Sequence, residues 1–181
     1  MTMKKRAFIF MVVLSAGLSG FSQSKYQSAV GIRVGSGYAD VVSASYKTFI
    51  GESPSAVEFN LGIKPGYGAY DVFNLSLAAT YQYHFPIAPV EGLQWFIGGG
   101  LIGYRSFSSY SGYRGFGLGI YPTGGVDYKF GNIPLNLSAD LRPTIRIAAP
   151  EFYDYSNFYF GNFAVSARYT LRYGQYSRTC S

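Results

Sequence analysis

The stretch PLNLSADLRPTIRI, residues 134–147, alternates apolar and polar side chains from Leu135 onward. Leucine, alanine, proline or isoleucine occupies every second position, and asparagine, serine, aspartate, arginine or threonine lies between them. Because successive side chains of a β-strand point to opposite faces of its sheet, the stretch predicts a strand with one apolar and one polar face. The polar face carries Asp140, Arg142 and Arg146. The main question is whether each face meets water, lipid or the interior of the protein.

Seven other segments repeat this period of two, and no amphipathic helix pattern follows residue 22. Segment 93–104 is apolar on both faces, so its orientation stays open. The eight predicted strands are residues 30–36, 41–50, 57–64, 72–85, 93–104, 115–130, 134–147 and 162–173.

The composition narrows the class of protein. Aromatic residues make up 19% of the 181 residues and charged residues only 13%, about half the charged share of soluble domains. The mean hydropathy is +0.08, so apolar residues are interleaved with polar ones, which argues against a helical membrane protein. Without the basic residues at positions 4–6, 12 Lys and Arg remain against 9 Asp and Glu. No basic run is left, and we expect no nucleic-acid partner.

The first 22 residues are predicted to be a secretory signal peptide. They begin with Lys4, Lys5 and Arg6, continue with an apolar run over residues 7–14, and end in small residues. This run is too short to cross a bilayer as a helix, which takes about 20 residues. We therefore expect cleavage near Ser22 and export of the mature chain.

The alternation, the aromatic content and the signal peptide together predict an all-β fold, an eight-stranded antiparallel up-and-down transmembrane β-barrel. Eight segments of about ten residues have the size of the smallest such barrels. The strands of a soluble β-sandwich also alternate apolar and polar side chains, but with so few charges and so many tyrosines its surface would be prone to aggregate. In a barrel, the apolar face meets lipid and the polar face fills the interior. The expected organisation is a signal peptide at 1–22, a barrel at 23–173 and a short periplasmic tail at 174–181.

Both termini of such a barrel are expected in the periplasm, with the barrel in the cell outer membrane. The odd connections then face outside the cell and the even ones are periplasmic turns. The expected outer loops are residues 37–40, 65–71, 108–115 and 149–157, and the expected periplasmic turns are 51–56, 86–92 and 131–134.

The interior of an eight-stranded barrel is narrow enough for side chains to fill it, so interior charges must neutralise one another. If the last outer loop is centred on Asp154, Asp140 faces Arg168, and we expect an ion pair between them. Lys47 is likewise expected opposite Glu58. The predicted interior polar network comprises Arg33, Lys47, Glu58, Asp127, Asp140, Arg142, Arg146 and Arg168. The predicted lipid-facing side chains are Phe59, Leu61, Leu75, Leu77, Leu137, Leu141, Val165 and Tyr169.

No catalytic residue, metal site or cofactor is predicted. The stretch GGGLIG (98–103) formally matches a dinucleotide-binding fingerprint, but it lies within a predicted strand and no helix follows. Its glycines are expected to relieve crowding in a narrow barrel. His84, the only histidine, is expected at the periplasmic end, and Cys180 has no partner for a disulfide. A filled interior also argues against porin-like conduction.

Four stretches carry a likeness to a known family: VGIRVGSG (30–37), SYKTF (45–49), GNIPLNLSADLRPTIRI (131–147) and FAVSARYTLRY (163–173). With these stretches the chain resembles the OmpX-like small outer-membrane barrels, especially those of the Bacteroidota. The resemblance implies an integral outer-membrane protein that the barrel-assembly machinery inserts. Outer-membrane lipid and lipopolysaccharide are then expected neighbours.

These features favour a protein without enzymatic activity that is a structural or accessory subunit of a larger outer-membrane complex, with other outer-membrane proteins as partners. Two alternatives remain: a lipid-modifying enzyme of the outer leaflet, and a small surface-interaction or adhesion barrel. The position of His84 weakens the first alternative, and the short outer loops weaken the second.

Overall fold

The computed structural model describes residues 26–51, 53–66, 72–150 and 157–171. These residues form ten β-strands and one 3-10 helix, η2 (Ser111–Tyr113). They contain no helix that is long and apolar enough to cross a membrane. The strands are β1 (Ser28–Gly35), β2 (Val42–Phe49), β3 (Ser55–Lys64), β4 (Phe73–Pro86), β5 (Leu93–Phe107), β6 (Gly115–Lys129), β7 (Leu135–Leu141), β8 (Thr144–Ala148), β9 (Phe158–Tyr159) and β10 (Phe163–Thr170).

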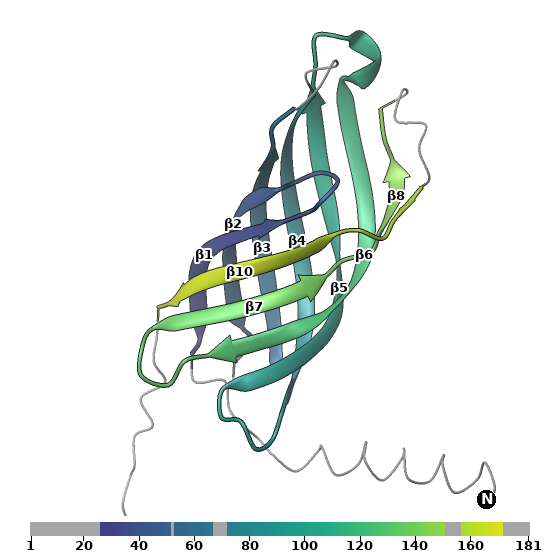
Figure 1. The fold of residues 1–181 in the computed structure, drawn as a ribbon. Helices are drawn as coiled ribbons and strands as arrows, with labels where there is room; N and C mark the ends of the chain where they lie inside the picture. Colours follow the sequence, from purple (N-terminus) through teal and green to yellow (C-terminus); the bar gives the residue numbers. More distant parts are fainter. Residues whose placement is uncertain (1–25, 52, 67–71, 151–156, 172–181) are drawn as a thin grey trace, which may run out of the picture.

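The strands close into one barrel (Figure 1). Strands β1 to β7 pair antiparallel in chain order, β7 pairs with β10, and β10 returns to β1. Strand β8 continues β7 along β6, and β9 lies beside β8 and precedes β10. The ten strands therefore occupy eight positions around the barrel. This confirms the predicted fold class, an eight-stranded antiparallel up-and-down transmembrane β-barrel.

The stretch 134–147 forms two strands rather than the one predicted, because β7 and β8 are separated at Arg142 and Pro143. The register of β6 with β7 and β8 places Pro143 opposite Pro122. Neither proline has an N–H group for the ladder, so the sheet loses hydrogen bonds at this point. The backbone N–H of Arg142 donates instead to the carbonyl oxygen of Asn162, 2.8 Å away. The alternation of buried and exposed side chains continues through the break.

The other predicted segments agree with the observed strands to within three residues at each described end. The orientation of segment 93–104, which the sequence left open, is settled in β5. Gln94 and Phe96 point inward and are buried, whereas Trp95 and Ile97 point outward and are 42% and 56% exposed.

The barrel wall is taller on one side than on the other. Strands β4, β5 and β6 have 14 to 15 residues, whereas β1 and β2 have 8 each. In Figure 1, the β4–β6 wall extends well beyond the hairpin of β1 and β2. The loop 37–40, predicted to face outside, belongs to the 36–41 connection between β1 and β2. This connection folds into the barrel mouth, where Ala39 and Asp40 are buried.

Several predictions concern segments outside the described residues. They are the signal peptide at 1–22, the tail at 174–181 with Cys180, and most of the outer loops 65–71 and 149–157.

Candidate functional site

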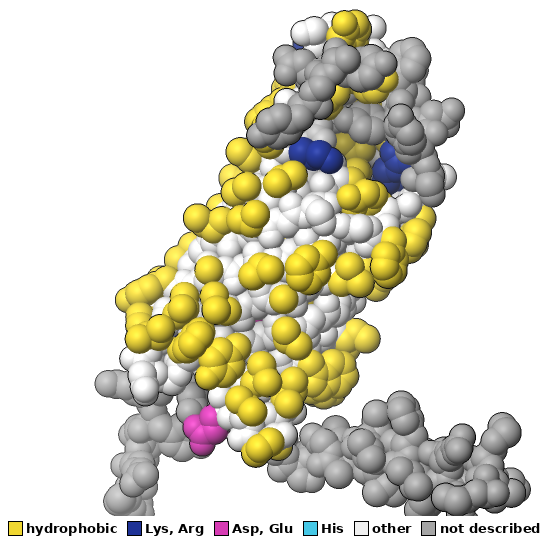
Figure 2. All heavy atoms as spheres, in the orientation of Figure 1, with side chains coloured by type: hydrophobic (Ala, Val, Ile, Leu, Met, Phe, Trp, Pro, Cys, Tyr) yellow, Lys and Arg dark blue, Asp and Glu magenta, His cyan; other side chains and the backbone are white. Residues whose placement is uncertain are grey.

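The outer surface of the wall is a broad apolar belt (Figure 2). Leu61, Leu77 and Tyr169 are 55%, 60% and 58% exposed, values that a soluble surface would not tolerate across a whole wall. The residues predicted to face lipid all lie on this outward face, exposed or half-buried: Phe59, Leu61, Leu75, Leu77, Leu137, Leu141, Val165 and Tyr169.

Aromatic side chains gather near both ends of the belt. At the end that carries Tyr26, the rings of Phe85 and Trp95 stack with centroids 4.3 Å apart. Near the opposite end, the rings of Phe73 and Phe107 lie 6.1 Å apart. Two aromatic bands around an apolar belt are the arrangement that transmembrane barrels use at the two membrane interfaces.

The side chains predicted to be interior all point into the lumen and are at most 9% exposed: Arg33, Lys47, Glu58, Asp127, Asp140, Arg142, Arg146 and Arg168. The described lumen also holds Asp40, which sequence reasoning did not include. The carboxylates Asp40, Glu58, Asp127 and Asp140 each form an ion pair, with N–O distances of 2.6–3.4 Å. Each of these four carboxylates is therefore neutralised by a cationic partner.

Glu58 on β3 is the centre of this network. Its Oε1 forms ion pairs with Arg142 at 2.8 Å and with Arg168 at 3.0 Å. The side-chain amides of Asn60 and Gln82 donate hydrogen bonds to its two carboxylate oxygens, at 2.9 Å and 2.8 Å. One carboxylate thus joins β3 and β4 to the opposite wall of the barrel. Removing one partner of such a buried ion pair lowers the free energy of unfolding, because the remaining charge stays buried without its partner.

A second group of contacts lies toward the end that carries Tyr26. Lys47 Nζ and Asp127 Oδ2 are 2.6 Å apart. Lys47 Nζ also lies 2.9 Å from His84 Nε2, and His84 Nδ1 lies 3.3 Å from the carbonyl oxygen of Pro54. Because an ammonium group only donates, His84 Nε2 accepts from Lys47. Both nitrogens of the ring thus have a structural partner.

The third group lies toward the hairpin of β1 and β2. Arg33 forms ion pairs with Asp140 at 2.9 Å and with Asp40 at 3.4 Å. Arg142 Nε lies 2.7 Å from Asp140, which connects this group to Glu58. The inward-folded connection 36–41 therefore adds the carboxylate of Asp40 to the network.

The predicted ion pair between Asp140 and Arg168 is wrong. Asp140 faces Ala164 in the register of β7 and β10. The prediction assumed a loop centred on Asp154, whereas the pairing of β8 with β9 places the centre near residue 152. This difference shifts the facing residue by four positions.

The prediction that Lys47 faces Glu58 is confirmed, because the two are Cα partners in the register of β2 and β3. The ammonium group nevertheless forms its ion pair with Asp127 on β6, across the lumen. Register fixes the neighbours along the wall, but long side chains in a narrow lumen also reach the far wall.

An aromatic cluster, here called the tyrosine plug, fills the lumen beside the inward-folded hairpin. It comprises Tyr38, Ala39, Ala78, Ile102, Tyr104 and Tyr121. The rings of Tyr38 and Tyr104 meet edge to face with centroids 5.2 Å apart. The Tyr121 hydroxyl lies 2.7 Å from Thr80 Oγ1. Together with the charge network, the plug occupies part of the described lumen with side chains.

Sequence reasoning missed the plug, although the inward glycines carry a signal for it. A Cβ atom on Gly117 would overlap the Tyr104 ring, and one on Gly119 would lie 3.1 Å from the Tyr38 hydroxyl. In the GGGLIG stretch, a Cβ atom on Gly100 would lie 2.8 Å from the Tyr121 ring. These glycines make room for tyrosines, which agrees with the expectation that they relieve crowding.

The described residues contain no group of three His, Cys, Asp or Glu side chains that would hold a metal ion. The GGGLIG stretch lies within β5, which is a strand throughout.

No protein-family model matches the chain, and no curated protein matches its sequence. Among solved structures, the chain is similar to Neisserial surface protein A (NspA), with a TM-score of 0.51 and 17% identity. The match covers 80% of this chain and 95% of that one. At this identity the likeness concerns the fold. The Bacteroidota type of the resemblance stays a prediction, and the chain is a small eight-stranded transmembrane β-barrel similar in fold to NspA.

Proposed function

We propose that this protein is an integral barrel of the bacterial outer membrane without enzymatic activity, and that it is a structural or accessory subunit of a larger outer-membrane complex. The observation that carries the proposal is a described lumen that holds paired charges and the tyrosine plug, behind an apolar outer wall. Interior side chains that are paired and packed in this way favour neither a solute passage nor a reaction chamber. The lipid-facing wall and the two rims are then the surfaces for contacts.

The apolar belt supports the location. A closed barrel satisfies its backbone hydrogen bonds within the sheet, so it can expose apolar side chains to lipid. A signal peptide followed by such a barrel fits export and insertion by the barrel-assembly machinery, with both termini in the periplasm. Outer-membrane lipid, lipopolysaccharide and other outer-membrane proteins are the proposed neighbours.

Planar-bilayer recordings test the filled lumen. The purified protein is expected to give no steady conductance, because four carboxylates and their cationic partners occupy the described interior. Steady single-channel currents from the folded protein would contradict the proposal and favour a small-solute pore.

Co-purification tests the accessory role. A tagged native protein, extracted in a mild detergent, is expected to bring other outer-membrane barrel proteins with it in a fixed ratio. Isolation as a free monomer under all mild conditions would contradict the accessory role while leaving the barrel itself intact.

The enzyme alternative has its own test. His84, the only histidine, is buried and lies between Lys47 and Pro54, where it has no exposed nitrogen to act as a base. Mass spectrometry of lipid A from cells with and without the protein is therefore expected to show the same species. A species that disappears on deletion would support the lipid-modifying alternative.

A further inference from the structure

Arg105 is a charged residue on the lipid-facing side of the wall. It lies on β5, where the outward side chains Ile97, Leu101 and Phe107 are 56%, 53% and 41% exposed. Its facing residues on the neighbouring strands are Leu75 on β4 and Phe116 on β6, both outward and exposed. A cation set among apolar neighbours on this face needs an explanation, because an arginine at the bilayer midplane costs about 2–4 kcal/mol.

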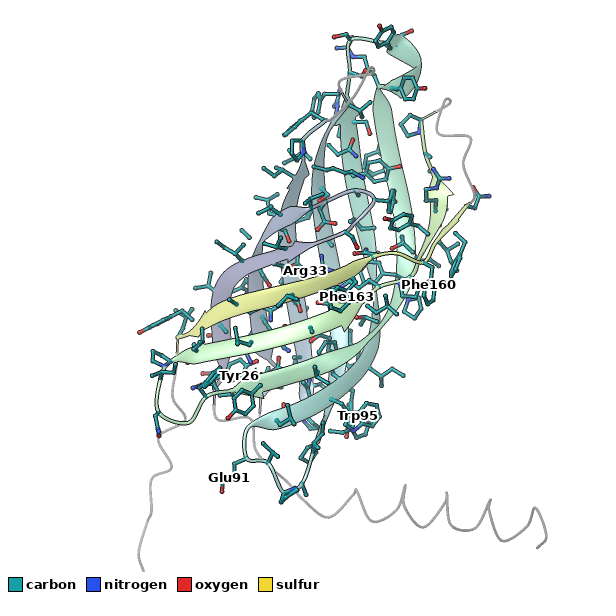
Figure 3. The ribbon with its side chains drawn as sticks, in the orientation of Figure 1. Tyr26, Arg33, Glu91, Trp95, Phe160 and Phe163 are labelled. Atoms are coloured by element: carbon teal, nitrogen blue, oxygen red, sulfur yellow. The ribbon has the colours of Figure 1, made fainter. Side chains whose placement is uncertain are left out.

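The height of Arg105 along the wall removes most of this cost. Trp95 projects from the same strand at the end of the barrel that also carries Glu91 (Figure 3). Arg105 follows ten residues later on the same face. At ~3.4 Å per residue and a tilt of ~40°, the two side chains lie about 25 Å apart along the membrane normal, the height of the apolar band of such barrels. Arg105 is thus at the opposite interface, where lipid headgroups begin.

A second arginine lies beside it. The register of β5 and β6 pairs Ser106 with Gly115, and its continuation by one position sets Arg114 opposite Phe107. Arg114 is therefore the diagonal neighbour of Arg105, and diagonal positions are about 7–8 Å apart between Cα atoms. Such a distance lets two guanidinium groups reach one anion.

The aromatic side chains between the arginines complete the site. The Arg105 guanidinium lies 5.6 Å from the centroid of the Phe107 ring. An open surface pocket of about 380 Å³ lies alongside, lined by Phe73, Phe107, Ser108, Ser109 and Arg114. One part of this cavity is aromatic and the other is cationic and hydroxyl-bearing, so it suits a ligand with an apolar chain and an anionic, hydroxyl-rich head.

The charge of the described residues leaves both arginines available for such a ligand. Neither Arg105 nor Arg114 forms an ion pair there. The described carboxylates lie elsewhere: Asp40, Glu58, Asp127 and Asp140 in the lumen, and Glu91 at the other end of the barrel (Figure 3).

We propose that Arg105 and Arg114 bind a phosphate group of a phosphorylated glycolipid in the outer leaflet, with an acyl chain against Phe73 and Phe107. This inference rests on the proposed outer-membrane location. Guanidinium groups bind phosphate oxygens through paired, charge-assisted hydrogen bonds, which are stronger than neutral ones. The hydroxyl groups of Ser108 and Ser109 offer hydrogen bonds to the sugar.

Native mass spectrometry of the detergent-solubilised protein with purified lipid A tests this site. The double variant Arg105→Gln/Arg114→Gln is expected to bind lipid A at least about tenfold more weakly, since two charge-assisted contacts are lost. Dephosphorylated lipid A is expected to bind the unmodified protein as weakly as lipid A binds the double variant. The double lysine variant, which keeps both charges, is expected to be intermediate because lysine lacks the bidentate fork.

A matched control removes one positive charge at the other end of the barrel. Lys129→Gln keeps a donor for the carbonyl oxygens of Phe130 and Ile133 and is expected to bind lipid A like the unmodified protein. All variants are first checked for the folded, heat-sensitive gel migration of a barrel. Equal binding of dephosphorylated lipid A, or unchanged binding by a folded double variant, would overturn the site. Inorganic phosphate binding as tightly as lipid A would overturn the assignment to a lipid.

An accessibility measurement separates this inference from the location on which it rests. In a Cys180→Ser background, Ser111→Cys in the η2 segment is expected to react with an impermeant maleimide on intact cells. If it reacts only after lysis, the site is not on the outer leaflet and the inference fails, whereas the conductance and co-purification results stand. If it reacts but lipid A does not bind, the inference fails and the proposed location stands.

Discussion

Glu58 and Phe59 are adjacent in β3, yet they meet opposite surroundings. The Glu58 side chain is inside the barrel, 1% exposed, and is neutralised by Arg142 and Arg168. The Phe59 side chain is outside and 46% exposed. In a soluble protein the charge would be outside and the ring inside. The difference shows that ion pairs and hydrogen bonds offset the cost of burying charges on the inner face of a barrel wall. On the outer face, contact with lipid in place of water stabilises the apolar side chains.

The largest effect is expected from breaking the inner face at its centre. Glu58→Gln removes the carboxylate between two buried arginines, and leaving buried charges without a partner costs about 3–5 kcal/mol. Urea titration of the protein in lipid vesicles measures the change in the free energy of unfolding. Glu91→Gln, an exposed acid of the same chemistry, is the control and is expected to change it by less than about 0.5 kcal/mol. Equal effects of the two would show that the network does not hold the barrel together.

The next effect comes from placing a charge on the outer face. Leu101 is 53% exposed and lies on β5 between the levels of Trp95 and Arg105. Leu101→Arg is expected to destabilise the vesicle-inserted protein by about 2–4 kcal/mol, as at a bilayer midplane, whereas Leu171→Arg near the rim that carries Tyr26 costs about 0–1 kcal/mol. The same titrations check both. Identical costs at the two depths would contradict the lipid-facing orientation of the wall.

A smaller effect is expected where the inner face is aromatic rather than charged. Gly117→Ala drives a methyl group into the Tyr104 ring, and overpacking of this kind costs about 1–3 kcal/mol. Gly131→Ala is the matched control, because a Cβ atom there has no neighbour within 4 Å. A tolerated Gly117→Ala, measured by the same unfolding titration, would mean that the plug is loose.

The smallest effect is the coupling between two tyrosines of the plug. A double-mutant cycle with Tyr38→Leu and Tyr104→Leu is expected to give about 0.5–1.5 kcal/mol for the edge-to-face contact. The control cycle pairs Tyr38→Leu with Tyr128→Leu, whose ring packs on Phe130 at the other end of the barrel. Distant sites are expected to add within about 0.3–0.5 kcal/mol. A coupling energy in the control cycle and none between Tyr38 and Tyr104 would contradict the edge-to-face contact in the tyrosine plug.

The faces of the strands were predictable because they depend on a local rule. Alternation assigns each side chain to one face whatever the register, so Glu58, Asp140 and Arg168 were placed inside without knowledge of their neighbours. Their partners were not predictable in the same way. A partner across the lumen depends on the barrel diameter and on loop centres, and an error of two residues in one loop centre removed the predicted pair of Asp140 and Arg168.

The tyrosine plug and the break at Pro143 were also missed, for a different reason. Each depends on two segments that are distant in the sequence or on different strands. The hairpin folds inward because Gly117 and Gly119 leave space for tyrosine rings, and β7 ends because Pro143 meets Pro122 across the ladder. The residues of a single segment do not determine which residues of another segment will lie opposite them.

The sequence by itself determined that this chain is a barrel with an apolar outside and a charged inside, because a period of two and a lipid-facing surface follow from residue order and composition alone. The tertiary structure decided how the inside is packed, by the partners of Glu58 and by the 36–41 connection, whose Tyr38 ring lies against Tyr104. It also set Arg105 opposite Phe116, so that Arg114 becomes its diagonal neighbour when the register of β5 and β6 is continued by one position. Registers depend on how the whole barrel closes, and closure is a property of all the strands together.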